Sequence, residues 1–300
     1  MGRMPRNFSN TDQQIFHIFN RACGLENERP LENLGCREKL LQLILRATKL
    51  HNFDIISFQI EGNHYHIEGR SNPNPVSRQE VARRYQDYYG KEIPQHILDD
   101  ETEFRRLVDR IASVSDFAGL FQGMFSRWYN REASRNGCPR RGSFWAGRFK
   151  CNELEMGDPV LACLEYIDLN CVKAGLSDSP ADYPYGSHAL WDQLEKHPCP
   201  EALCEVVGHS LEIAWRKRGP HIDIANPVVI LAHVRDRSSL AARNVASKRS
   251  RGRHHYLDRR CRSGVRASRS EDAPCTLWDR DGVVGSVKFV HARLCELVTR

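Results

Sequence analysis

The chain has 300 residues, which is enough for a full hydrophobic core and for more than one domain. Its hydrophobic content of 40% is that of a globular protein, and no apolar run approaches the length of a membrane span, so we expect no membrane association. The formal net charge of +6 favours a polyanionic partner, although many soluble proteins are mildly basic.

The cysteines and the N-terminal residues indicate a compartment. Eleven cysteines are scattered along the chain without a CxxC pair, which predicts free thiols in a reducing cytosol. The first residues, Met1 to Arg6, carry no apolar signal core. We therefore expect a cytoplasmic protein.

The hydrophobic periodicity, taken in chain order, predicts an α+β protein. A strand is expected at 14–20, a helix at 36–51, and a β-hairpin at 53–60 and 64–69. Helices follow at 78–89, 99–113 and 117–133, then a strand at 148–154 and a helix that begins at Pro159. The first two of these helices form an expected helical insertion at about 71–113.

The second strand of the hairpin carries two histidines. Side chains at i and i+2 of a strand share a face, so His64 and His66 point together. Neutral imidazoles commonly bind divalent metals, although two incidental strand histidines are the alternative. Glu68 lies on the same face and is either a further ligand or base, or a solvated charge at the strand end.

The helix from Pro159 carries a phenol and an amide. Tyr166 and Asn170 are four residues apart and share one face, and Gly175 is placed to end the helix. A buried structural tyrosine is the alternative. Together with the histidines, these groups suit a metal site with a tyrosine nucleophile beside it. The core-facing stripe of this helix is Val160, Leu161, Leu164, Ile167 and Val172.

A second tyrosine, Tyr129, is the rival candidate for a nucleophile. It lies in the helix expected at 117–133, whose apolar stripe is typical of a core-facing helix. Arg127 and Arg131 beside it would suit a DNA strand, but no asparagine follows Tyr129 one turn later. The pattern therefore favours Tyr166.

The loop before the strand at 148–154 mixes cations with aromatic rings. Cations hold phosphates, so four residues are candidates for DNA binding: Arg140, Arg141, Arg148 and Lys150. Phe144 and Trp145 either stack unpaired bases or plug the core.

Four sequence blocks occur in a characteristic order. They are Asn-His-Tyr-His at 63–66, Trp-Ala-Gly-Arg-Phe-Lys at 145–150, Tyr-x-x-x-Asn-x-Val-Lys-Ala-Gly-Leu within 164–176, and Asp-Tyr-Pro-Tyr-Gly-Ser at 182–187. This order resembles the single-tyrosine HUH transposases, especially the REP-associated tyrosine transposases, over residues 12–190. The resemblance implies an α+β fold over residues 1–195, with a ferredoxin-like antiparallel sheet and helices on one face (the HUH endonuclease fold).

The resemblance also implies a site and a reaction. Carried over residue by residue, His64 and His66 bind Mg²⁺ or Mn²⁺, with Asn170 as the third ligand. Tyr166 is the nucleophile. Such an enzyme nicks and joins single-stranded, hairpin-forming DNA through a 5′-phosphotyrosine intermediate during DNA transposition. It acts as a monomer or a homodimer.

The chain departs from the family pattern at Gly62 and Cys171, where a proline is frequent, and these changes affect geometry and substrate choice more than reaction type. Two other functions stay open. One is a domesticated, non-catalytic nucleic-acid-binding protein with the same fold. The other is a metal-dependent phosphodiesterase that uses the histidines without a covalent step.

Residues 196–300 form an expected C-terminal extension beyond the resemblance. Helices are expected at 202–217 and 226–236. Residues 243–269 are very basic, with Asp258 as the only acid, which is typical of a disordered nucleic-acid-binding tail, a basic helix on DNA or a solvated tail. A valine-rich segment at 282–297 is expected to fold back or to form a small separate unit.

Overall fold

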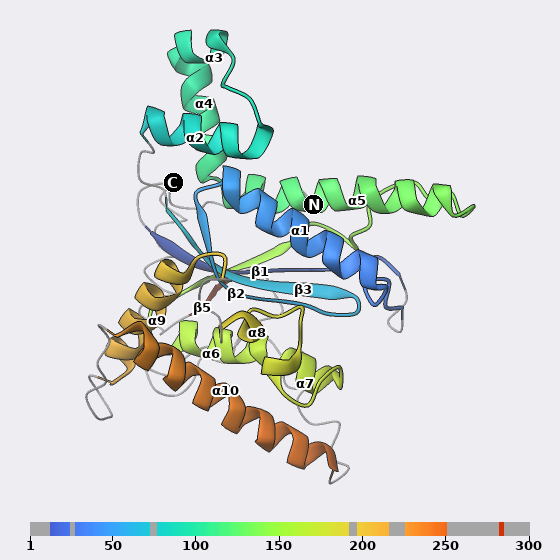
Figure 1. Ribbon diagram of the computed structural model, residues 1–300, viewed down its shortest axis with the longest axis vertical. Helices are drawn as coiled ribbons and strands as arrows, with labels where there is room; N and C mark the ends of the chain where they lie inside the picture. Colours follow the sequence, from blue (N-terminus) through green and yellow to red (C-terminus); the bar gives the residue numbers. More distant parts are fainter. Residues whose placement is uncertain are drawn as a thin grey trace.

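A computed structural model describes residues 13–24, 28–72, 77–191, 197–215, 226–250 and 282–284. The protein is built on an antiparallel sheet in the order β2-β3-β1-β4, with the short strand β5 parallel to β4 at the edge (Figure 1). The expected α+β class with an antiparallel sheet is confirmed. The strands are β1 (Gln14–Arg21), β2 (Phe53–Ile60), β3 (His64–Ser71), β4 (Lys150–Leu154) and β5 (Gly282–Val284).

The helices follow the sequence pattern closely. The short α3 is absent from the sequence prediction, and the helix expected from Pro159 is interrupted at Leu169. Before β4 the helices are α1 (Leu34–Leu50), α2 (Arg78–Tyr89), α3 (Gln95–Asp99), α4 (Glu101–Ala112) and α5 (Val114–Arg135). After β4 they are α6 (Asp158–Asp168), α7 (Asn170–Ala174), the 3₁₀ turn η1 (Pro180–Asp182), α8 (His188–Trp191), α9 (Pro200–Trp215) and α10 (Pro227–Ser250).

Helices cover both faces of the sheet, so the expectation of helices on one face is wrong. α1 and α5 lie on one face, and α6 and α9 pack on the other (Figure 1). The reason is that the strands are apolar on both sides. Phe16 and Ile18 join the core beneath α1 and α5, whereas Ile15 and Leu154 join a second core with α6 and α9.

The helices α9 and α10, which follow residue 195, belong to this second layer. α9 packs against β2 and α6, and α10 packs against α6, α7 and α9. The two helices expected in this part of the chain are therefore present. Residues 251–281 and 285–300, which hold most of the basic run 243–269 and of the valine-rich segment, lie outside the described residues, and the domain boundary at 195 stays a prediction. Among the helices that the structure describes, each is too short or too polar to span a membrane.

The helices α2, α3 and α4 form a module that projects from the sheet layer, at the position of the expected helical insertion (Figure 1). The module has a small core of its own, in which Val81, Tyr88, Phe104 and Ile111 are buried with Leu50 of α1. This shared core joins the module to the end of α1.

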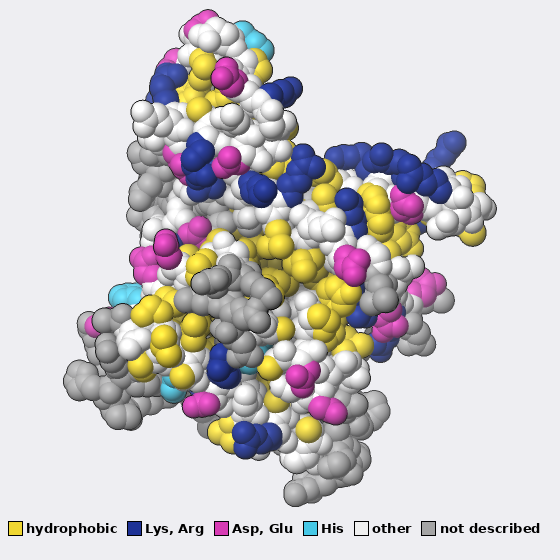
Figure 2. All heavy atoms as spheres, in the orientation of Figure 1, with side chains coloured by type: hydrophobic (Ala, Val, Ile, Leu, Met, Phe, Trp, Pro, Cys, Tyr) yellow, Lys and Arg dark blue, Asp and Glu magenta, His cyan; other side chains and the backbone are white. Residues whose placement is uncertain are grey.

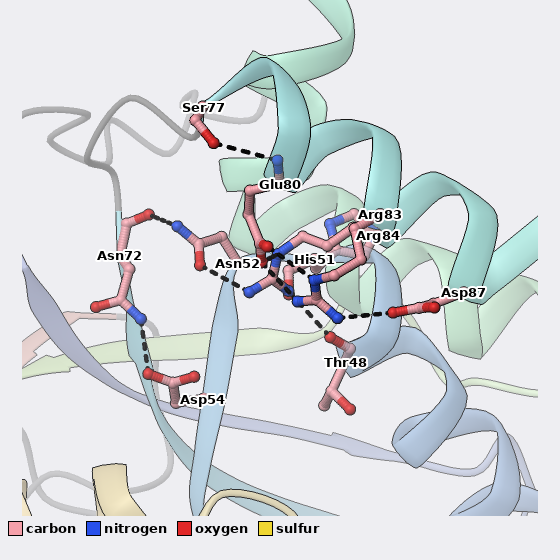
Figure 3. A network of polar contacts seen from close by, with 10 residues as sticks. All are labelled: Thr48, His51, Asn52, Asp54, Asn72, Ser77, Glu80, Arg83, Arg84 and Asp87. Carbon is pink, nitrogen blue, oxygen red and sulfur yellow. Dashed lines mark hydrogen bonds and ion pairs between the residues drawn. The ribbon is translucent and has the colours of Figure 1, made fainter. Parts of the chain in front are cut away.

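A mostly buried guanidinium strengthens the junction (Figure 3). Arg84 of α2 donates to the carbonyl oxygens of Thr48 and His51, at 3.4 Å and 2.8 Å, and to the Asn52 side-chain oxygen at 3.3 Å. The last carbonyls of a helix have no partner within the helix, and a cation is favoured at this negative end of the helix dipole. Glu80 completes the network with an ion pair to Arg84 at 2.7 Å.

Arg84→Ala is expected to lower the free energy of unfolding by about 2–4 kcal/mol, because charged hydrogen bonds to otherwise unpaired carbonyls are lost. The matched control is Arg83→Ala. Among the described residues the exposed Arg83 pairs with Glu80 and Asp87 alone, and such surface pairs contribute about 0–1 kcal/mol. Urea unfolding of both variants measures the difference. Equal losses in the two variants would contradict the capping role of Arg84.

Candidate metal and nucleophile site

Strand β3 places different side chains on its two faces. Tyr65 and Ile67 are fully buried in the core beneath α1 and α5. His64 and His66 point to the opposite face, where their ring centroids lie 5.0 Å apart. The period of two residues along a strand causes this division, and the two imidazoles lie together as the sequence predicts.

The turn between β2 and β3 adds a carboxylate to the two imidazoles. Ligand atoms of Glu61, His64 and His66 all lie within 4.8 Å of one another. The Glu61 amide donates to the His64 carbonyl oxygen at 2.8 Å, which closes the turn, and the Glu61 carboxylate lies 3.3 Å from His64 Nε2. Glu61 is not among the site residues that the sequence pattern predicts. The available signal was the tight hairpin turn, which brings residues three apart side by side.

The Nδ1 atoms of both histidines are held by neighbouring side chains. His64 Nδ1 donates to Asn63 Oδ1 at 2.7 Å, because that amide oxygen only accepts. His66 Nδ1 lies 2.9 Å from His17 Nε2. Burial lowers the pKa of His17 to about 3 and the pKa of His66 well below its usual value, so both rings are neutral. A metal-binding imidazole is commonly oriented in this way by an outer partner on its second nitrogen.

Tyr166 comes to this cluster from α6. Its ring is half-buried and lies edge-on to two imidazoles, with centroid distances of 5.4 Å to His66 and 6.0 Å to His17. The ammonium of Lys173, on α7, lies 4.6 Å from the centroid of the Tyr166 ring. The Tyr166 ring therefore has two imidazoles and a cation as close neighbours.

The helix that carries Tyr166 is not continuous as far as Asn170. α6 ends at Asp168 and α7 begins at Asn170, with Leu169 between them at φ −79° and ψ −7°. The expectation of one unbroken helix over 159–175 is therefore wrong. Asn170 is buried at the start of α7, and its Nδ2 atom has no hydrogen-bond partner among the described residues.

A glutamine on the sheet explains why the helix is interrupted. Gln59 of β2 accepts from the Cys171 amide at 2.7 Å and donates to the Asp168 carbonyl oxygen at 3.3 Å, so one side chain bonds the backbone on both sides of the break. Gln59 is also the register partner of His66 on β3. The break in the helix is therefore held directly beside the histidine pair.

A buried polar network braces the end of α6. Asp168 Oδ2 accepts from Ser238 Oγ at 2.7 Å and from His188 Nδ1 at 3.0 Å, and all three residues are at most 2% exposed. Arg237 forms an ion pair with Glu165 at 3.3 Å. Since Ser238 and Arg237 belong to α10, this late helix holds the segment of α6 that carries the tyrosine.

Glu68 lies on the same face of β3 but is not a solvated charge, and that alternative is wrong. Its side chain is fully buried, and its carboxyl oxygens have no hydrogen-bond partner in the part of the chain that the structure describes. Burial first, and the charge of Asp168 second, raise the pKa of Glu68 well above its usual value. Burial beneath α6 therefore favours the protonated form of Glu68.

The loop cations expected to bind DNA divide into two groups. Arg141, Arg148 and Lys150 are exposed. Lys150 belongs to the same row of the sheet as His66, because Phe19 of β1 is the register partner of both residues. Lys150, and Arg148 two residues before it, therefore lie near the strand end that carries the histidines, whereas Arg141 lies next to Gly142, whose carbonyl oxygen accepts from Asn130 of α5 at 2.8 Å.

Arg140 is instead held against aromatic rings. Its guanidinium carbon lies 5.3 Å from the Tyr129 ring centroid and 5.7 Å from that of Phe144. Phe144 and Trp145 are buried in the core beneath α1 and α5, so they plug the core and do not stack bases. Tyr129 packs against the same core, on the face of the sheet away from the histidines.

Comparisons with known proteins show a weak likeness to a solved structure. No protein-family model matches the chain, and no curated protein matches it either. Among solved structures, the chain is similar to that of a REP-associated tyrosine transposase bound to a REP hairpin. The likeness has a TM-score of 0.35 and 14% sequence identity, and it covers 62% of this chain and 82% of that one. A likeness of this size carries no conclusion about activity.

Ser238→Ala is expected to lower the free energy of unfolding by about 1–3 kcal/mol, because the buried Asp168 carboxylate loses a hydrogen-bond donor. Ser239→Ala, the same change at the neighbouring and more exposed residue of α10, is the matched control and should change stability by less than about 0.5 kcal/mol. Urea unfolding measures both values. A loss in Ser238→Ala no larger than in the control would show that α10 does not brace α6 through this contact.

Proposed function

We propose that the chain is a metal-dependent transposase of the HUH single-tyrosine type, which nicks and joins single-stranded DNA on a ferredoxin-like fold. The observation that carries the proposal is the Glu61–His64–His66 cluster, with the Tyr166 ring 5.4 Å from His66. Metal ligands beside a half-buried phenol are the groups that phosphodiester transfer to a tyrosine needs. The four sequence blocks and the antiparallel sheet support the same proposal.

The side chains of the cluster fit a divalent cation. Glu61 Oε1 is buried without a hydrogen-bond partner among the described residues, and His64 and His66 each have Nδ1 occupied by an outer side chain. A carboxylate with two imidazoles forms a mixed oxygen and nitrogen donor set that suits Mn²⁺ and also accepts Mg²⁺. When bound, such a cation neutralises phosphate charge and polarises phosphorus.

The covalent step uses the phenol of Tyr166. Its oxygen attacks phosphorus, a bond from phosphorus to the tyrosine oxygen forms, and the bond from phosphorus to the 3′ oxygen breaks. The phenol proton balances the charge on the departing 3′ oxygen, which leaves as a hydroxyl. Attack by another 3′-hydroxyl on the 5′-phosphotyrosine reverses the step and joins two strands without a nucleotide cofactor.

Two residues of the chain assist this step through their positions. The Lys173 ammonium, 4.6 Å from the Tyr166 ring centroid, stabilises negative charge on the attacking oxygen. His17 holds the second nitrogen of His66 and so fixes the direction of its ring.

The proposed partner is single-stranded, hairpin-forming DNA. The exposed cations Arg148 and Lys150 are placed to hold its phosphates near the strand end that carries the histidines, and the exposed Arg141 is a further candidate for phosphate binding. The proposed setting is the cytoplasm, with the protein acting as a monomer or a homodimer.

Tyr166→Phe is expected to abolish a covalent protein–DNA adduct while leaving DNA binding unchanged, because only the nucleophilic oxygen is removed. The assay is a denaturing gel of the full chain with labelled single-stranded hairpin DNA, from sequence flanking its own gene, and Mn²⁺. Tyr129→Phe is the matched control and should retain the adduct.

The possible results separate three functions. An adduct that persists in Tyr166→Phe would refute the assigned nucleophile. Metal-stimulated nicking that survives in this variant, with no adduct in either protein, would identify a phosphodiesterase. Tight binding with neither adduct nor nick, across several flanking hairpins and both metals, would identify a non-catalytic binding protein.

Glu61→Gln is expected to weaken Mn²⁺ binding by about 10–100-fold, because the cluster loses its negative oxygen donor. Calorimetric titration of the full chain with Mn²⁺ measures this without any catalytic readout, and His64→Ala is expected to weaken binding at least as much. Asn170→Ala tests the third ligand that the sequence resemblance implies. Unchanged affinity in both Glu61→Gln and His64→Ala would exclude this cluster as the metal site.

A further inference from the structure

A row of arginines runs along the exposed side of α5. Arg127, Arg131 and Arg135 follow one another at four-residue spacing, so they share one face of the helix, and all three are exposed. Figure 2 shows Lys and Arg side chains gathered along α5 and in the corner between α5 and the projecting module. This face belongs to the helical layer opposite the one that contains α6 and the tyrosine.

Two of these arginines have no acidic partner among the described residues. Arg127 and Arg131 make no ion pair or hydrogen bond within the residues that the structure describes, whereas Arg135 pairs with Glu132 at 2.7 Å. Some exposed arginines elsewhere on the surface are neutralised by neighbouring acids, as in the pairs Arg29–Glu32, Arg78–Glu101, Arg83–Glu80 and Arg106–Glu103. Arg127 and Arg131 therefore leave two unneutralised positive charges on the exposed side of α5.

Arg46 of α1 extends the charge across the neighbouring helix. Its guanidinium carbon lies 4.7 Å from the ring centroid of Tyr88, and it donates to the Tyr88 carbonyl oxygen at 3.3 Å. Burial raises the pKa of the Tyr88 phenol, and the charges of Arg46 and Arg127 both act against this rise, so both arginines lie near Tyr88. The name α5 ridge is used below for Arg46, Arg127 and Arg131.

The spacing on the α5 ridge suits a sugar–phosphate backbone. Four residues of helix rise about 6 Å, which is close to the distance between successive phosphates of one strand. The rings of Trp128 and Tyr129 beside the arginines pack against the core, so they are not presented for base stacking. On α5 the cations therefore lie beside no exposed aromatic ring, which favours a duplex, whose bases are already paired, over a single strand.

We propose that the α5 ridge binds the phosphate backbone of duplex DNA, the stem of a hairpin whose unpaired flank lies in the tyrosine site on the other face of the sheet. The proposal rests on the proposed function in one respect, that the duplex is part of the same DNA molecule that is cut. The two surfaces then have different roles. The ridge holds the stem without reading its sequence, and the face of the sheet that carries the Glu61–His64–His66 cluster acts on the single strand.

The test is a salt titration of DNA binding by the full chain carrying Arg127→Gln and Arg131→Gln together. Fluorescence anisotropy is measured without divalent metal, with a labelled hairpin and with a single strand of equal length that has no stem. For the hairpin, the slope of log affinity against log salt should become shallower by about 1.8, since each lost phosphate contact removes about 0.9. For the stemless strand, the slope and the affinity should stay unchanged.

The matched control is Arg83→Gln with Arg106→Gln, two exposed arginines that are already neutralised, and it should leave both slopes unchanged. Glutamine keeps the helix propensity of arginine, and an unchanged urea midpoint confirms that each variant is folded. An unchanged hairpin slope in the α5 variant, or an equal loss with the stemless strand, would overturn the proposal.

The outcome is independent of the covalent chemistry. A shallower hairpin slope in a protein that forms no adduct would keep the ridge and reject the proposed function. An adduct in the Tyr166 assay together with an unchanged hairpin slope would keep the proposed function and reject the ridge.

Discussion

The burial of both faces of β3 is the constraint on which the rest of the structure depends. One face gives Tyr65 and Ile67 to the core beneath α1 and α5, and this fixes the register of the strand. A slip of one residue would bury the histidines in that core and expose the apolar side chains. The polar face of β3 is then covered by α6, so each polar group on it needs a partner, a neutral state or a ligand.

Residues far from α6 in the sequence hold α6 in place over that polar face. Gln59 bonds both sides of the break between α6 and α7, and Ser238 of α10 bonds Asp168 from the other side. The tyrosine is thus positioned by a sheet strand below and by a late helix above. A side chain that must reach a reacting atom within a fraction of an ångström gains from support of this kind.

Much of the fold could be predicted because its signals are local. Period-two alternation located β3, and apolar spacing located α1, α2 and α5. Two features needed long-range information that a single sequence does not show. The break at Leu169 depends on Gln59, more than a hundred residues earlier in the chain. The second helical layer depends on how α9 and α10 return to pack against α6. The place of Glu61 is different, because it follows from the local hairpin turn that the sequence predicts.

The compactness of the metal-ligand cluster along the chain has a consequence for how the protein folds. Glu61, His64 and His66 all belong to one hairpin, whereas the tyrosine lies about a hundred residues further on. Hairpins close within microseconds, and contacts of high sequence separation form later because they must first overcome loop-closure entropy. We therefore expect the Glu61–His64–His66 cluster to assemble early and Tyr166 to dock against it last, so that a nascent chain completes the proposed metal site before the proposed nucleophile is in place.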